Sequence, residues 1–83
     1  MMILPGPPEA DVRRARKDIR RFISEHQGDT MMLTPEGLIR DRIVEAYGEY
    51  TQSLAIAALD DLVALGVLET IAPDPFTYTV IRR

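Results

Sequence analysis

Apolar residues recur along the first third of the chain at the spacing of an amphipathic helix. Between Glu9 and Gln27 they follow an i, i+3, i+4, i+7 pattern, which predicts a helix over this range. Glu9 and Asp11 suit its first turn because the helix dipole favours anions there, and Gly28 suits its C-terminal stop. The predicted buried stripe consists of Val12, Ala15, Ile19, Phe22, Ile23 and His26.

A second helix is predicted after the short apolar segment 30–33, which predicts a strand. Thr34 is a suitable N-cap, and Pro35 suits the first helical position because its missing N–H is not needed there. We expect this helix to continue to about Tyr47 and to be followed by a turn at 48–50. Its predicted inward residues are Ile39, Ile43, Ala46 and Tyr47.

A third helix and a hairpin complete the pattern. The helix is predicted over 51–65 and ends at Gly66, which readily adopts a left-handed conformation. Segments 67–72 and 76–83 then predict two strands around a tight turn, with Phe76, Tyr78 and Val80 on one face. The predicted apolar face of the helix consists of Leu54, Ala55, Ala58, Leu59, Leu62 and Leu65.

The segment "LDDLVALGVLET" at 59–70, followed by "PDPFTYTVI" at 73–81, resembles the winged-helix superfamily. In that superfamily a Leu-rich recognition helix passes directly into a β-hairpin called the wing. The resemblance implies an α+β, mostly helical fold of order α-β-α-α-β-β, a three-helix winged helix-turn-helix with a C-terminal β-hairpin wing. It covers residues 9–83 as one domain after a Pro-rich lead-in at 1–8. A generic domain of three helices and a hairpin is the alternative.

Charge is segregated along the chain, although the net charge is only −3. No Lys or Arg lies between Ile43 and Ile81, an interval that contains six acidic residues. Residues 1–42 sum to +1, and the last two residues add +2. The half of the fold that contacts DNA in most winged helices is therefore expected to repel phosphate.

The outward face of the third helix combines small, apolar and acidic residues, which favours a protein interface over a DNA reader. Ala64 lies on the same face. The candidate protein-interface residues are Tyr50, Ser53, Ile56, Ala57, Asp60, Asp61 and Asp74.

Cations instead cluster in "RRARKDIRR" at 13–21, which holds six Lys or Arg residues. One interpretation is a solvated helix face, with Asp18 paired to Arg14 or Arg21. The other is a contact for phosphates or for an acidic protein. The candidate nucleic-acid contacts are Arg13, Arg14, Lys17, Arg20, Arg21, Arg40, Arg42, Gln52 and Ser53.

The residue types predict a protein that is not an enzyme and has no cofactor or metal. There is no Cys, and the single His26 has no partners for a metal site or a catalytic triad. Asp60 and Asp61 are adjacent, so on a helix they point about 100° apart and form no dyad. No apolar run approaches the roughly 18 residues of a membrane span. We therefore expect a cytoplasmic protein without a small-molecule substrate.

Two functions follow from these patterns. The first is a small stand-alone winged-helix module that binds a protein partner or a second copy of itself as a dimer. A phage- or plasmid-type accessory factor or inhibitor of nucleic-acid machinery would have this character. The alternative is a DNA-binding transcriptional regulator, in which the third helix reads bases and the Arg-rich first helix contacts phosphates.

Overall fold

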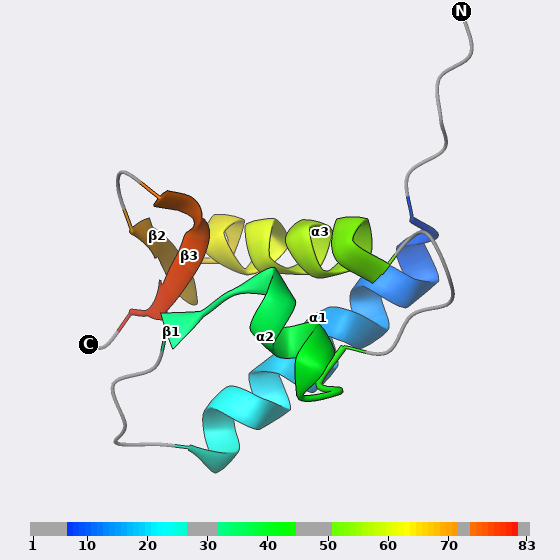
Figure 1. The fold of residues 1–83 in the computed structure, drawn as a ribbon, viewed down its shortest axis with the longest axis horizontal. Helices are drawn as coiled ribbons and strands as arrows, with labels where there is room; N and C mark the ends of the chain where they lie inside the picture. The colour runs from blue at the N-terminus through cyan, green and yellow to red at the C-terminus, as the bar shows by residue number, and fades with distance from the viewer. Residues whose placement is uncertain (1–6, 27–31, 45–50, 72–73, 82–83) are drawn as a thin grey trace, which may run out of the picture.

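The structure of the chain is a computed structural model that describes residues 7–26, 32–44, 51–71 and 74–81. Within these ranges the fold is α+β and mostly helical, with three helices and a three-stranded antiparallel sheet (Figure 1). The element order agrees with the order expected from the sequence. The elements are α1 (Glu9–Glu25), β1 (Met32–Leu33), α2 (Pro35–Arg40), α3 (Thr51–Ala64), β2 (Leu68–Ile71) and β3 (Asp74–Val80).

α1 begins where the sequence predicts and buries most of the predicted stripe. Val12, Ala15 and Ile19 are buried, and Phe22 and Ile23 pack against the core from its edge. The helix ends at Glu25, before Gln27, and the expected stop at Gly28 lies outside the described residues.

His26 does not belong to the buried stripe, so this part of the prediction is wrong. The residue is the C-cap of α1 and is exposed. Its Nδ1–H donates to the Phe22 carbonyl at 2.9 Å, and the two rings lie 4.3 Å apart between centroids. His26 therefore packs on Phe22 at the end of the helix instead of entering the core, because α1 ends at Glu25 and the backbone of His26 is no longer helical.

The N-terminus of α2 confirms the predicted cap. The Thr34 hydroxyl accepts a hydrogen bond from the Gly37 N–H at 3.1 Å, and Pro35 occupies the first turn. This bond satisfies one of the backbone donors that a helix start leaves unpaired. Of the predicted inward residues, Ile39 and Ile43 pack against the core, whereas Ala46 and Tyr47 lie outside the described residues.

α2 is shorter than predicted, because it ends at Arg40 and does not continue to about Tyr47. Arg42 adopts the left-handed conformation, with φ 57°, and reverses the chain. The Ile43 N–H then donates to the Leu38 carbonyl at 2.9 Å, which is the closing bond of a Schellman motif. Glycine usually takes the left-handed position of this motif, so an arginine at this position does not predict the end of the helix.

α3 confirms the predicted third helix and its stop at Gly66, whose φ is 79°. The Val67 N–H donates to the Leu62 carbonyl at 2.9 Å, so this helix also ends in a Schellman motif. Such a motif brings the third-last helical residue and the residue after glycine together on the core side. Leu62 is fully buried and Val67 packs against the core, but Leu65 is 61% exposed, contrary to the prediction.

The sheet has the order β1-β3-β2, with β3 in the centre. Leu33 pairs with Tyr78 on one side of β3, and Thr70 pairs with Tyr78 on the other. The predicted common face of the last strand is wrong in part, because Phe76 is 53% exposed while Tyr78 is 1% exposed. Thr77 is buried as well, next to the register irregularity between Thr70 and Ile71 of β2.

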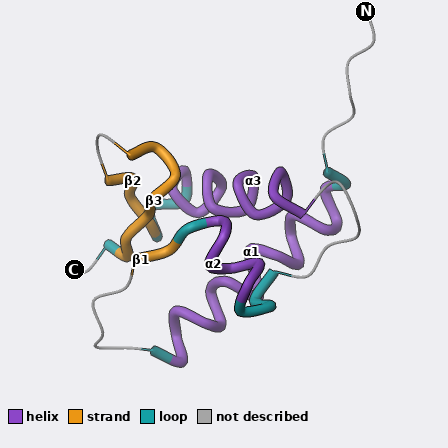
Figure 2. Tube along the Cα trace, viewed as in Figure 1, coloured by secondary structure: helices purple, strands orange, loops and turns teal. Residues whose placement is uncertain are grey.

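α3 is the central element of the fold. α1 and α2 pack against it, and its C-terminal end leads into β2 (Figure 1). The sheet therefore lies at one end of the helical layer, as the secondary-structure colouring makes plain (Figure 2). Within the described ranges, no helix has the length and apolar character needed to cross a membrane. The buried core consists of Val12, Ala15, Ile19, Leu33, Leu38, Val44, Leu54, Ala55, Ala58, Leu59, Leu62, Leu68 and Tyr78.

Candidate interaction surfaces

The outward face of α3 is narrower than the sequence predicts. Ser53 and Ala64 are exposed as expected, as is Gln52 in the first turn. Ile56 and Ala57 are only partly exposed, and Ala57 also packs against the hydrophobic core. Both α1 and α2 pack against α3.

Asp60 is exposed but has a defined partner in the sheet. The Tyr78 hydroxyl donates to Asp60 Oδ1 at 2.8 Å, which ties β3 to the second half of α3. Burial of Tyr78 raises its pKa to about 12, with further contributions from the hydrogen bond and the negative charge of Asp60. The Tyr78 hydroxyl thus joins two elements.

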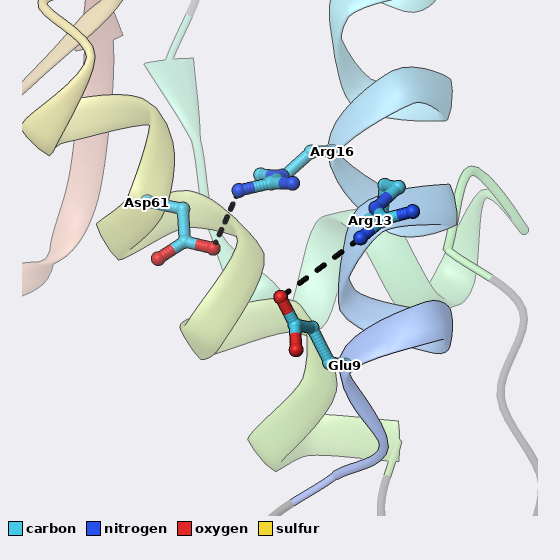
Figure 3. Close-up of polar contacts among 4 residues, drawn as sticks. All are labelled: Glu9, Arg13, Arg16 and Asp61. Carbon is cyan, nitrogen blue, oxygen red and sulfur yellow. Dashed lines mark hydrogen bonds and ion pairs between the residues drawn. The ribbon is translucent and has the colours of Figure 1, made fainter.

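Asp61 forms an ion pair across the interface between two helices. Arg16 Nη1 of α1 lies 3.1 Å from Asp61 Oδ2 of α3, and the two side chains are 30% and 45% exposed (Figure 3). One turn earlier on α1, Arg13 lies 3.9 Å from Glu9, and both side chains are largely exposed. The close-up shows Arg16 reaching from α1 toward α3, whereas the Glu9–Arg13 pair stays on α1.

Some acidic residues of the C-terminal half therefore have partners in the structure. The view of this half that the charge pattern gave is corrected accordingly. Asp60 accepts a hydrogen bond from Tyr78, and Asp61 pairs with Arg16. Glu69 is exposed on β2. Of the other candidates, Tyr50 and the side chain of Asp74 lie outside the described residues.

A groove joins the first turns of α2 and α3 to β3, and we call it the Phe76 groove. It has a volume of ≈ 280 Å³, and its lining residues include exposed Glu36 and Gln52. None of them is a lysine or an arginine. The full lining of the Phe76 groove is Thr34, Pro35, Glu36, Gln52, Phe76 and Thr77.

The candidate cations of α1 lie on two neighbouring sides of the helix. One side opens into a groove of ≈ 480 Å³, which we call the arginine groove. Its lining residues are Arg13, Arg16, Lys17, Arg20 and Leu65.

The other side of α1 faces α2. There Arg14, Arg21 and Arg42 line an open groove together with Asp18 and Glu25, so its charge is mixed. The structure thus brings Arg42 to the α1 cations, as the sequence suggested.

The predicted pairing of Arg14 with Asp18 is not observed, and Arg40 forms an ion pair that the sequence did not predict. Arg14 pairs with Asp11 at 3.5 Å, not with Asp18. Arg40 pairs with Asp41 at 3.5 Å, is 80% exposed and does not line the groove that Arg42 lines. Both observed pairs join residues close in sequence, where a short side chain reaches its neighbour without any tertiary contact.

Three features of these surfaces had no sequence signal strong enough to find them. Arg16 and Asp61 are 45 positions apart, and Tyr78 and Asp60 are 18 apart. Only the packing of α1 and β3 on α3 brings these groups together. The exposure of Leu65 depends on the chain reversal at Gly66. The sequence predicted the position of this reversal, but not the side to which it turns Leu65.

Within the described residues, no group of three or more carboxylate or histidine side chains is arranged to hold a metal ion. The arrangement offers hydrogen-bonding and apolar contacts, together with one basic groove. No protein-family model matches the chain, and no significant match was found among curated proteins or among solved structures.

Proposed function

We propose that this chain is a winged-helix binding module without enzymatic activity that acts mainly through protein–protein contact. The winged-helix assignment is supported by the element order and by the place of β1 at the edge of the β2–β3 hairpin sheet. In this assignment α2 and α3 form the helix-turn-helix, and the β2–β3 hairpin is the wing.

The observation that carries the proposal is the composition of the Phe76 groove. In a winged helix the first turn of α3 and the wing form the surface that approaches DNA. Here that surface presents Phe76 at 53% exposure beside Glu36 and Gln52, without a cation among the lining residues. Phosphate binding requires cations, whereas exposed aromatic side chains are enriched in the centres of protein interfaces.

The internal partners of Asp60 and Asp61 narrow the proposed contact surface. These carboxylates stabilise the fold, because each joins a neighbouring element to α3. The proposed surface is therefore the N-terminal half of α3 together with the Phe76 groove. Its central residues are Gln52, Ser53 and Phe76.

The test compares two exposed apolar residues on the same sheet. Phe76→Ser alters the Phe76 groove, whereas Met32→Ser alters an exposed apolar side chain of β1, at 64%, that does not line it. Self-association is measured by light scattering over a concentration series, and partners are captured from cells that express each variant. We expect Phe76→Ser to abolish an association that Met32→Ser retains. Identical behaviour of the two variants and the unaltered chain would refute the proposal.

DNA binding is the second candidate, and one observation favours it. Gln52 and Ser53 are exposed in the first turn of α3, where recognition helices meet bases. If this helix faces DNA, Asp60→Asn should strengthen binding, since it removes a negative charge while keeping an acceptor for Tyr78. A labelled duplex titrated from about 50 to about 200 mM salt should then show steep loss of affinity. Absence of binding at the lower salt concentration would exclude this candidate.

A further inference from the structure

The arginine groove combines a basic stripe with an exposed leucine. Arg13, Arg16, Lys17 and Arg20 follow the i, i+3, i+4, i+7 spacing, so they share one side of α1. Leu65 enters the groove from the C-terminal end of α3 and is 61% exposed. This surface is separate from the Phe76 groove, with which it shares no lining residue.

The cations of the groove are not equivalent. Arg16 forms an ion pair with Asp61 at 3.1 Å, and Arg13 lies 3.9 Å from Glu9. Among the described residues, Lys17 and Arg20 have no ion-pair partner, and both are exposed. Four cations less these two neighbouring acids leave a local charge of +2, which sits in a chain of net charge −3.

The exposure of Leu65 follows from the way in which α3 ends. The Val67 N–H bonds back to the Leu62 carbonyl, so Leu62 and Val67 take the core side of the turn. Leu65 is left on the outside, next to the α1 cations. An exposed leucine alone needs no explanation, but one that lines a basic groove gives that groove an apolar contact.

We propose that the arginine groove binds an acidic segment of a partner protein that also carries an apolar side chain. The carboxylates of the segment would pair with Lys17 and Arg20, and its apolar side chain would cover Leu65. Charge complementarity selects an acidic segment, and Leu65 favours a peptide over duplex DNA because the outer surface of a duplex presents charged phosphates and few apolar groups. Duplex binding also depends on neutralising several phosphates, which a local charge of +2 serves poorly.

This inference adds a second contact surface to the proposed binding module, and it can be tested independently of the Phe76 groove. A negative result at the arginine groove would not count against the proposal for the Phe76 groove, because different variants probe the two surfaces. Conversely, loss of every association in Phe76→Ser would not alter the peptide chemistry expected at Lys17, Arg20 and Leu65.

The experiment selects a phage-displayed library of random short peptides against the intact protein. Enriched sequences are synthesised with a fluorescent label, and their affinities are measured by anisotropy. The variants are Lys17→Glu, Arg20→Glu and Leu65→Ser. Arg40→Glu is the matched control, because it makes the same charge change on an exposed arginine that does not line the groove. Thermal unfolding of each variant shows that the fold is retained.

We expect the enriched peptides to combine Asp or Glu with Leu, Ile or Phe. Each charge reversal in the groove should weaken binding by roughly tenfold, whereas Arg40→Glu should change it little. Peptides in which Lys replaces Glu should regain affinity for the Lys17→Glu variant. The proposal is overturned if no acidic–apolar peptide is enriched, or if Leu65→Ser leaves binding unchanged. It is equally overturned if a labelled DNA duplex binds through Lys17 and Arg20 instead.

Discussion

The hydrogen bond between Tyr78 and Asp60 makes the stability of the domain depend on alkaline pH. Tyr78 is 1% exposed, and its hydroxyl donates to Asp60 Oδ1 at 2.8 Å. Burial, the hydrogen bond and the charge of Asp60 together raise the pKa of Tyr78 from 10.0 to about 12. Ionisation would place a phenolate in the core beside a carboxylate, so the native state resists it.

The sign of the effect follows from proton binding. Below pH 10 the Tyr78 hydroxyl is protonated in both the folded and the unfolded chain, so its contribution to stability is fully present. Between pH 10 and 12 the unfolded chain loses this proton while the folded chain keeps it. Stability should then fall by about 1.4 kcal/mol per pH unit, to a total loss of about 2–3 kcal/mol. A small domain of this size has only about 4–12 kcal/mol in all.

The perturbation that isolates this effect is Tyr78→Phe, which keeps the ring and removes the ionisable hydroxyl. At pH 7 we expect a loss of about 1 kcal/mol, because exposed Asp60 can hydrogen-bond to water once the hydroxyl is gone. Above pH 10 the variant should lack the part of the decline that belongs to Tyr78. Tyr47 and Tyr50 are present in both proteins, so their ionisation cancels in the comparison.

The assay is urea unfolding followed by far-ultraviolet circular dichroism from pH 7 to pH 12, with the two proteins measured in parallel. Asp60→Asn is the control, because it keeps an acceptor and removes the charge, and its decline should end at a lower pH. The reasoning fails if Tyr78→Phe retains the full alkaline decline of the unaltered protein, or if the unaltered protein shows no decline between pH 10 and 12.

Three further predictions concern the ends and contacts of the helices. Arg42→Gly should stabilise the domain by about 0.5–1 kcal/mol in thermal unfolding, because glycine relieves the left-handed strain at φ 57°; equal stabilisation by Arg42→Ala would contradict this. Arg16→Ala should cost about 0.5–1 kcal/mol at low salt and less at high salt, whereas Arg13→Ala should cost almost nothing; equal costs in urea unfolding would refute the assigned pair. Leu62→Ala should cost about 2–5 kcal/mol, but Leu65→Ala less than about 0.5 kcal/mol, since only Leu62 is buried.

The sequence predicted the helices and most of the core because apolar periodicity reports which face of an element is covered. The stripe of α1 and the buried leucines and alanines of α3 recur at the three- and four-residue spacing of a helix, and their burial needs no knowledge of the partner element. The end of α2 was mispredicted because the stop depends on the backbone of Arg42, a residue type that rarely takes the left-handed conformation. Leu65 was mispredicted because its periodic position continues the stripe, while the chain reversal at Gly66 turns it outward.

The sequence predicted the exposed residues of the candidate surfaces only where exposure follows from the position of a residue within its own helix. Gln52 and Ser53 lie in the first turn of α3, and the sequence placed them outward correctly. Asp60 and Asp61 were read as free acids, because their partners come from distant parts of the chain. Charge counts along a sequence therefore overstate repulsion wherever tertiary packing supplies a counter-charge, as Arg16 does for Asp61.

The two adjacent carboxylates of α3 each join it to a different element. Neighbouring positions on a helix point about 100° apart, so Asp60 and Asp61 can serve different elements. Asp60 anchors β3 through Tyr78, and Asp61 anchors α1 through Arg16. The second half of α3 is thus joined to two other elements through these side chains. Substitutions of Gln52 or Ser53 should therefore change binding without changing stability, whereas substitutions of Asp60 or Asp61 should change stability first.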